Sequence, residues 1–170
     1  MTRARRASSV RLDGLRKVSV GSMLSDCVRH VLTAARDEAN LICGVGAVAE
    51  ALESDVDAAL CVLATGDSEL SDPAVQIYFK LIEAFCIEYG VHLLKVDSSL
   101  LLAKWTRQSS VKSRARRGCV LITGDKYSKA LAILRSYCMQ EGGFVSKSSL
   151  RLRERVEAES EIGVGNSCVE

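Results

Sequence analysis

The sequence predicts an α/β fold, a three-layer α/β/α sandwich with a small central mixed sheet. Two observations support this prediction. Amphipathic stretches with the 3.6-residue period of a helix alternate with short apolar runs typical of buried strands. Residues that start or stop helices separate several of these stretches. Because each helix must bury its apolar face, the alternation favours helices on both sides of one sheet.

The first half of the chain contains four predicted elements. Apolar side chains recur at helical spacing from Val20 to Ala39 and predict the first helix. A short strand at Leu41–Cys43 and a helix at Val45–Glu53 follow. The run Ala58–Ala64 is apolar throughout, which indicates a strand buried on both faces.

The next helix has the clearest boundaries in the sequence. Asp72 is a suitable N-cap, Pro73 suits the first helical position, and Gly90 is placed to end the helix. Apolar residues repeat between these limits, and we expect them to form one buried face: Ala74, Ile77, Tyr78, Leu81, Ile82, Phe85 and Tyr89.

The second half continues the alternation. We expect a strand at Val91–Val96, a short helix at Ser98–Trp105, a strand at Cys119–Thr123 and a long helix at Tyr127–Met139. These elements place a single domain at residues 18–145.

Three further segments are expected to be mobile. Residues 1–17 carry six cations and one acid, and we expect a disordered basic arm, with a solvated tail, a weak nuclear signal and a mitochondrial transit peptide as alternatives. Residues 106–118 form a predicted mobile basic loop, and residues 146–170 a mobile mixed-charge tail. The loop is a candidate partner or nucleic-acid surface because it contains five cations and no acid: Arg107, Lys112, Arg114, Arg116 and Arg117.

Composition excludes several classes of protein. The 170 residues suffice for one domain with a sizeable core, and the net charge of +2 is too small to imply nucleic acid or membrane. The apolar runs are too short to cross a bilayer. The seven cysteines are odd in number and sit mostly at apolar positions, which favours a reducing compartment. Their spacing does not indicate zinc, so we expect no metal and no cofactor.

Catalytic signals are weak. Gly44–Ala49 satisfies the Gly-x-Gly-x-x-Gly/Ala pattern of dinucleotide sites, but the strand before it is very short, and a tight strand-to-helix turn is the alternative. Thr123–Lys126 could bind an anion or form a plain turn. His30 and His92 are expected to be structural or exposed. We therefore predict no enzyme activity.

The segment Leu60–Cys86 resembles a known family. Leu60–Ala64 reads Leu-Cys-Val-Leu-Ala, an acidic loop follows, and Val75–Cys86 reads Val-Gln-Ile-Tyr-Phe-Lys-Leu-Ile-Glu-Ala-Phe-Cys. These residues resemble the growth arrest and DNA damage-inducible stress-sensor (GADD45) proteins, within the fold of the L7Ae/L30e ribosomal proteins. The segment His92–Val96 continues the match. The chain departs from the family at Gly46, where the family has Tyr, and lacks its C-terminal Trp-Val-Pro segment.

The resemblance implies a non-enzymatic adaptor that binds and activates a MAP kinase kinase kinase. It also implies association with proliferating cell nuclear antigen and cyclin-dependent kinase complexes, homodimerisation, and a location in nucleus and cytoplasm. Asp67, Glu69 and Asp72 match the family's acidic partner-binding loop. The matching self-association helix includes Gln76, Ile77, Lys80 and Leu81. The sequence leaves open whether Leu81 lies in the core or at an interface.

The same fold offers a rival function, because kink-turn RNA readers place Gly-x-Asn-Glu-x-x-Lys at the start of the second helix. Here the corresponding positions are Gly44, Gly46, Ala47 and Glu50. The side chains that would contact base edges are missing, and an acid replaces a cation that would face phosphate. Specific RNA binding through this surface is therefore not expected, whereas the basic loop leaves weak, salt-sensitive binding open.

Overall fold

The computed structural model describes residues 9–66, 71–108, 118–124 and 128–154, with side chains described from residue 20 onward. Helices and strands alternate along the chain as the sequence predicts. The elements are α1 Ser9–Asp37, β1 Leu41–Cys43, α2 Val45–Glu53, β2 Ala58–Ala64, α4 Pro73–Glu88, β3 Leu93–Val96, α5 Ser99–Trp105, β4 Cys119–Thr123 and α7 Lys129–Glu141.

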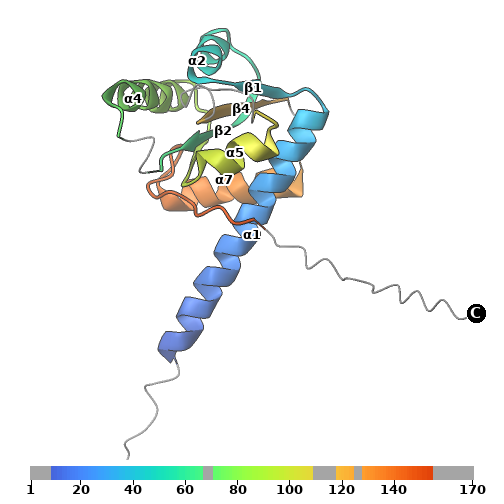
Figure 1. Cartoon of the computed structure of the whole chain (residues 1–170), viewed down its shortest axis with the longest axis vertical. Helices are drawn as coiled ribbons and strands as arrows, with labels where there is room; N and C mark the ends of the chain where they lie inside the picture. Colours follow the sequence, from blue (N-terminus) through green and yellow to red (C-terminus); the bar gives the residue numbers. More distant parts are fainter. Residues whose placement is uncertain (1–8, 67–70, 109–117, 125–127, 155–170) are drawn as a thin grey trace, which may run out of the picture.

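The four strands form one mixed sheet in the order β1-β4-β2-β3. Strand β4 is antiparallel to both β1 and β2, whereas β2 and β3 run parallel, with Cys61 opposite Leu93 and Ala64 opposite Val96. Helices α2 and α4 cover one face, and α1, α5 and α7 cover the other (Figure 1). The predicted three-layer α/β/α sandwich is confirmed.

Strand β2 shows why the sheet is buried on both sides. Its side chains point to alternate faces, as the pleat of a strand requires. Leu60 and Val62 pack with α1, α5 and α7, whereas Cys61 and Leu63 pack with α2 and α4. All four are fully buried, which explains the continuous apolar run in the sequence.

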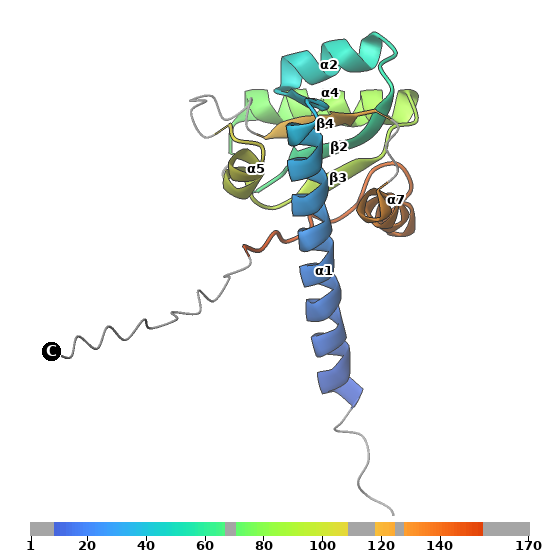
Figure 2. The ribbon, with the colours of Figure 1, turned by 90° about the vertical axis from the view of Figure 1, so that its right-hand side faces the viewer.

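Helix α1 begins at Ser9, so the expectation of a disordered arm over residues 1–17 is wrong from Ser9 onward, and residues 1–8 lie outside the described part of the chain. The sequence permits this continuation, because no proline lies between Ser9 and Val20 and each backbone N–H there can take part in a helical hydrogen bond. Its first turns extend beyond the α/β body (Figure 2).

The segment after α7 also differs from expectation. We call residues 144–154 the C-terminal strap, because they run along the outer edge of β3 instead of forming a mobile tail from residue 146. The Leu93 N–H donates to the Phe144 carbonyl at 2.6 Å, and the Leu150 N–H donates to the Lys95 carbonyl at 2.8 Å. Leu150 and Leu152 are buried. The strap supplies the backbone partners that an edge strand otherwise lacks, so the domain extends beyond residue 145.

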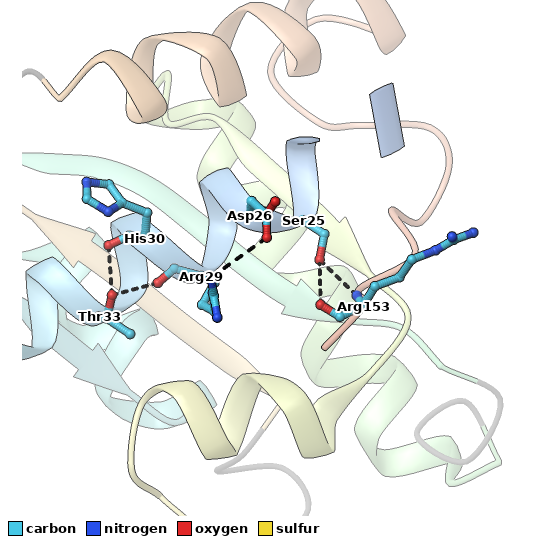
Figure 3. A network of polar contacts seen from close by, with 6 residues as sticks. All are labelled: Ser25, Asp26, Arg29, His30, Thr33 and Arg153. Atoms are coloured by element: carbon cyan, nitrogen blue, oxygen red, sulfur yellow. Dashed lines mark hydrogen bonds and ion pairs between the residues drawn. The ribbon is translucent and has the colours of Figure 1, made fainter. Parts of the chain in front are cut away.

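A polar contact fixes the end of the C-terminal strap to α1 (Figure 3). The Arg153 N–H donates to Ser25 Oγ at 2.8 Å, and Ser25 Oγ lies 3.2 Å from the Arg153 carbonyl, to which it donates. Ser25 is almost completely buried.

Among the described residues, none of the helices is long and apolar enough to span a membrane.

Candidate partner-binding surface

Asp72 marks the described end of the acidic loop, and the structure gives it a structural role. Its side chain accepts a hydrogen bond from the Ala74 N–H at 2.9 Å, and Pro73 occupies the first turn, which confirms the predicted helix start. The carboxylate is therefore held at the N-terminus of α4, where the helix dipole favours negative charge. Asp67 and Glu69 lie outside the described residues.

Helix α4 carries apolar side chains on two sides, so the predicted single buried face is wrong. The side that packs on the sheet consists of Val75, Phe79, Ile82 and Cys86, of which only Ile82 belongs to the predicted set. Ile77 is 70% exposed, Tyr78 50% and Leu81 43%. A helix with apolar residues all around usually packs on two sides, which makes this outer side a candidate contact surface.

The four residues of the predicted self-association helix all lie on the exposed side of α4. Gln76, Ile77, Lys80 and Leu81 are each exposed. Leu81 is an exposed residue and not part of the core, which answers for the described structure the question that the sequence left open.

A groove lies between α4 and the C-terminal strap. Its volume is about 740 Å³. We call it the lysine-lined groove because the charged residues that line it within the described part of the chain are Lys80, Lys95, Lys147 and Glu83. Lys95 Nζ lies 3.0 Å from Glu83 Oε1, and Lys80 Nζ lies 3.3 Å from Glu83 Oε2. Pro73, Ile77 and Phe79 add apolar surface to its wall.

This groove was not found in the sequence analysis. Lys95 alternates with buried residues on β3, and Lys147 follows the buried Ser146 in a segment that was expected to be mobile. The alternation Leu150-x-Leu152 was a signal for an extended, half-buried segment.

The Gly44–Ala49 turn does not support a dinucleotide site. Gly44 precedes α2 with a φ of 100°, which suits glycine and makes a tight turn between β1 and α2. Strand β1 is an edge strand that pairs antiparallel with β4. Dinucleotide sites of the Rossmann type instead lie at the carboxyl ends of parallel strands, at the centre of the sheet. The tight-turn alternative agrees with this topology.

The start of α2 presents little that could bind RNA. Gly46, Ala47 and Glu50 are exposed, so the surface that corresponds to the kink-turn readers offers two small residues and a carboxylate. Of the basic loop, only Arg107 is described: it is exposed, with a φ of 58°. Lys112, Arg114, Arg116 and Arg117 lie outside the described residues.

The buried thiols are poor candidates for nucleophiles. A hydrogen bond to Cys119, together with burial, raises the pKa of the Cys61 thiol well above its usual value. A hydrogen bond to Cys61 and burial raise the pKa of Cys86, and burial raises the pKa of Cys138 to about 11. These thiols stay protonated near neutral pH. The six cysteines of the described part of the chain are free, and no group of three potential metal ligands occurs there.

The two histidines occupy different environments. His30 is exposed on α1, where its backbone carbonyl accepts a hydrogen bond from Thr33 (Figure 3). His92 is half-buried before β3, with its ring 5.1 Å from that of Phe144. Burial, followed by the charge of Arg135, lowers the pKa of His92.

The family assignment follows from comparison with known proteins. The sequence model of the ribosomal protein L7Ae/L30e/S12e/Gadd45 family matches residues 26–132, which cover the sheet and the start of α7. The chain belongs to this family. The assignment confirms the resemblance that the motifs between Leu60 and Val96 indicated.

Several curated relatives within the family are similar over most of their length. The growth arrest and DNA damage-inducible protein GADD45 alpha of Rattus norvegicus is 32% identical over 73% of this chain and 84% of its own. The human protein of that name is 30% identical over 75% of this chain and 86% of its own. GADD45 beta of Bos taurus is 32% identical, over 71% of this chain and 81% of its own. The names of these relatives describe growth arrest and induction by DNA damage.

Proposed function

We propose that this protein is a non-enzymatic, stress-responsive signalling adaptor that binds and activates a MAP kinase kinase kinase. The observation that carries the proposal is the surface of α4: Ile77, Tyr78 and Leu81 are exposed beside the end of the acidic loop at Asp72. The names of the relatives, which refer to growth arrest and DNA damage, support a role in the stress response.

The acidic loop supplies the charge of the contact and α4 its apolar surface. Asp67, Glu69 and Asp72 would meet a basic segment of the kinase, where electrostatics sets encounter rate and specificity more than affinity. Activation requires that the adaptor bind the open kinase more tightly than the closed kinase, since a ligand shifts an equilibrium only by its differential affinity.

The proposal also includes homodimerisation and further partners, which the resemblance to the family implies. Homodimerisation would use the exposed side of α4, with Leu81 near the two-fold axis, because an isologous interface buries the same surface on both subunits. Association with proliferating cell nuclear antigen and cyclin-dependent kinase complexes, in nucleus and cytoplasm, completes the proposed role in growth arrest, DNA repair and apoptosis.

The decisive experiment is capture of MAP kinase kinase kinases from lysate of stressed cells. The test variant is Asp67→Asn, Glu69→Gln and Asp72→Asn, which removes three charges, while asparagine still caps α4. The matched control is Glu50→Gln, Glu53→Gln and Asp55→Asn, three exposed acids on and after α2. We expect the wild type and the control to capture the kinase and the test variant to lose it.

Equal capture by the test variant would refute the assignment of the site. Absence of kinase with every version would refute the adaptor function. A steep loss of RNA affinity with rising salt would then favour the RNA-binding alternative, with the basic loop as the contact.

A further inference from the structure

We infer that Ser54 is a phosphorylation site for an acid-directed Ser/Thr protein kinase, and that the phosphate loosens the last turn of α2. The inference rests on the acids that follow Ser54 in the sequence, on the exposure of the turn that carries it, and on the contact that its hydroxyl makes. It does not depend on the proposed function, because here the protein is the substrate of a kinase and not its activator.

The residues after Ser54 have the charge pattern that such a kinase selects. Asp55 and Asp57 occupy the first and third positions after the serine, and Glu53 precedes it. In the full sequence, Ser54 alone among the serines and threonines has an acid at both of these positions. Charge around the acceptor helps to decide which kinase acts on a protein, and a kinase with a basic substrate groove favours carboxylates after the acceptor.

The connection between α2 and β2 presents these residues to solvent. Helix α2 ends at Glu53 and β2 begins at Ala58, so residues 54–57 form the connection. All four are exposed. Helix α2 itself lies at the outer surface of the α/β body (Figure 2). A kinase can therefore reach the hydroxyl and both aspartates without disturbing the core.

The backbone of the connection can extend into a kinase active site. The Ser54 N–H donates to the Glu50 carbonyl at 3.0 Å, and the Val56 N–H donates to the Ala51 carbonyl at 3.4 Å, which is long for such a bond. Exposed backbone hydrogen bonds of this kind open locally at low cost. Asp55 has a φ of 55°, a left-handed conformation that is unfavourable for a residue with a Cβ and that extension relieves.

The transfer uses ATP as the phosphoryl donor and leaves ADP. Ser54 Oγ forms a bond to the γ-phosphorus while the bond from that phosphorus to the β–γ bridging oxygen breaks, and the hydroxyl proton passes to the catalytic aspartate of the kinase. The product carries about 1.5 to 2 negative charges near neutral pH.

This charge would lie at an unfavourable place on α2. In the unmodified protein, Ser54 Oγ donates a hydrogen bond to the Glu50 carbonyl at 2.7 Å, and the phosphorylated oxygen no longer has that proton. The phosphate also lies at the C-terminal end of a helix, where the helix dipole disfavours negative charge, and beside Glu53 and Asp55 in the sequence. The last turn of α2 therefore opens more often in the phosphorylated protein.

The test is phosphorylation of the full, folded chain by a purified acid-directed Ser/Thr kinase with ATP, with the modified position assigned by mass spectrometry. The test variant is Asp57→Asn, which removes the carboxylate at the third position and leaves the backbone carbonyl that accepts from the Gly124 N–H. The matched control is Glu50→Gln, which removes an exposed carboxylate one turn before Ser54 and keeps both acids after it.

We expect phosphate on Ser54 in the wild type and in the Glu50→Gln control at equal kcat/KM. The Asp57→Asn variant should lose roughly tenfold or more in kcat/KM at Ser54, as expected for the loss of one charged contact. Absence of phosphate on Ser54, or equal kcat/KM for the Asp57→Asn variant and the control, would overturn the inference.

A destabilised variant shows whether the kinase acts on the folded chain. Leu150→Ala removes a side chain from the core on the α1 side of the sheet, away from α2. Its kcat/KM at Ser54 should equal that of the wild type. A value that rises as the protein becomes less stable would show that the acceptor is the unfolded chain, which contradicts the inference.

Hydrogen exchange measures the effect of the phosphate on α2. Backbone amides in the last turn of α2 should exchange several-fold faster in the phosphorylated full chain than in the unmodified chain, whereas those of α7 should not change. Ser54→Ala loses the hydroxyl without gaining charge, so it should show a smaller increase. Unchanged exchange in α2 after phosphorylation would disprove the loosening of the helix.

Discussion

Asp72 shows how one residue can serve both stability and binding. Its carboxylate caps α4 through the Ala74 N–H, and it also belongs to the acidic loop that we propose as the partner contact. A charge reversal at this position would remove the cap and the negative charge together. The two roles therefore need variants that separate hydrogen-bond acceptance from charge.

We predict that Asp72→Ala lowers the free energy of unfolding by about 1 kcal/mol, because the first turn of α4 loses its cap, whereas Asp72→Asn changes stability little. Urea denaturation of both variants measures this difference. Equal stability of the alanine variant and the wild type would show that the cap does not contribute.

Protonation of His92 is expected to affect the stability of the folded protein. Its Nδ1 is buried without a hydrogen-bond partner in the described part of the chain, and burial and Arg135 lower its pKa. Protonation is thus less favourable in the folded protein than in the unfolded chain, where the pKa is near 6.5. As the pH falls through 6.5, the unfolded state binds more protons and the folded state loses stability.

We predict that stability falls between pH 7.5 and the lowered folded pKa of His92, and that His92→Gln makes this fall shallower. His30→Gln, which replaces an exposed histidine on α1, is the matched control. Urea denaturation at several pH values gives the slopes. If the His92 and His30 variants keep equal slopes, His92 is not the group responsible.

At the scale of the element, α4 combines a core side with an exposed apolar side. Two neighbouring residues belong to different sides: Ile82 is fully buried on the core side, whereas Leu81 is 43% exposed on the other side. The sequence predicted the helix, its cap and its first residue, but the predicted buried face included both Leu81 and Ile82. Periodicity places residues around a helix, and only the position of the sheet decides which side is covered.

We predict opposite outcomes for glutamate at these two positions. Ile82→Glu should prevent stable folding, since it buries an unpaired carboxylate. Leu81→Glu should leave stability within about 0.5 kcal/mol of wild type, as is usual for surface changes, and should produce a monomer if the proposed dimer forms through α4. Circular dichroism and sedimentation equilibrium distinguish these results. A folded dimer of the Leu81 variant would exclude this side as the interface.

At the scale of the whole molecule, the C-terminal strap closes the edge of the sheet and joins three distant parts of the chain. It pairs with β3, contacts α1 through Ser25, and reaches α5 through the Glu154–Lys104 ion pair. Its two leucines complete the core on the α1 side of the sheet. The lysine-lined groove exists because the strap forms one of its walls.

We predict that Leu150→Ala lowers the free energy of unfolding by about 2–5 kcal/mol, because it leaves a cavity in the core. Arg151→Ala, at an exposed position next to it, should change stability by less than about 0.5 kcal/mol. Urea denaturation compares the two variants. Similar stability of both would mean that the strap is not part of the folded core.

The sequence by itself determined the elements and the family. The predicted ranges of β1, α2, β2 and β4 agree with the structure at both ends. Strong apolar runs and local turn residues define these four elements in the sequence. The other helices and β3 differ by at most two residues at each end, apart from the start of α1. The motif from Leu60 to Cys86 identified the family, because its order of residues is specific to that family. A helical or strand-like period of apolar residues, by contrast, occurs in many unrelated proteins.

Tertiary structure alone decided which apolar side of α4 is buried, where Leu81 points, and that residues 144–154 pair with β3. It also brought Lys80, Lys95 and Lys147 from a helix, a strand and the C-terminal strap into one groove. The physical reason is that burial and edge pairing depend on contacts between segments far apart in the chain, whereas caps, turns and helical periods depend on neighbours in sequence.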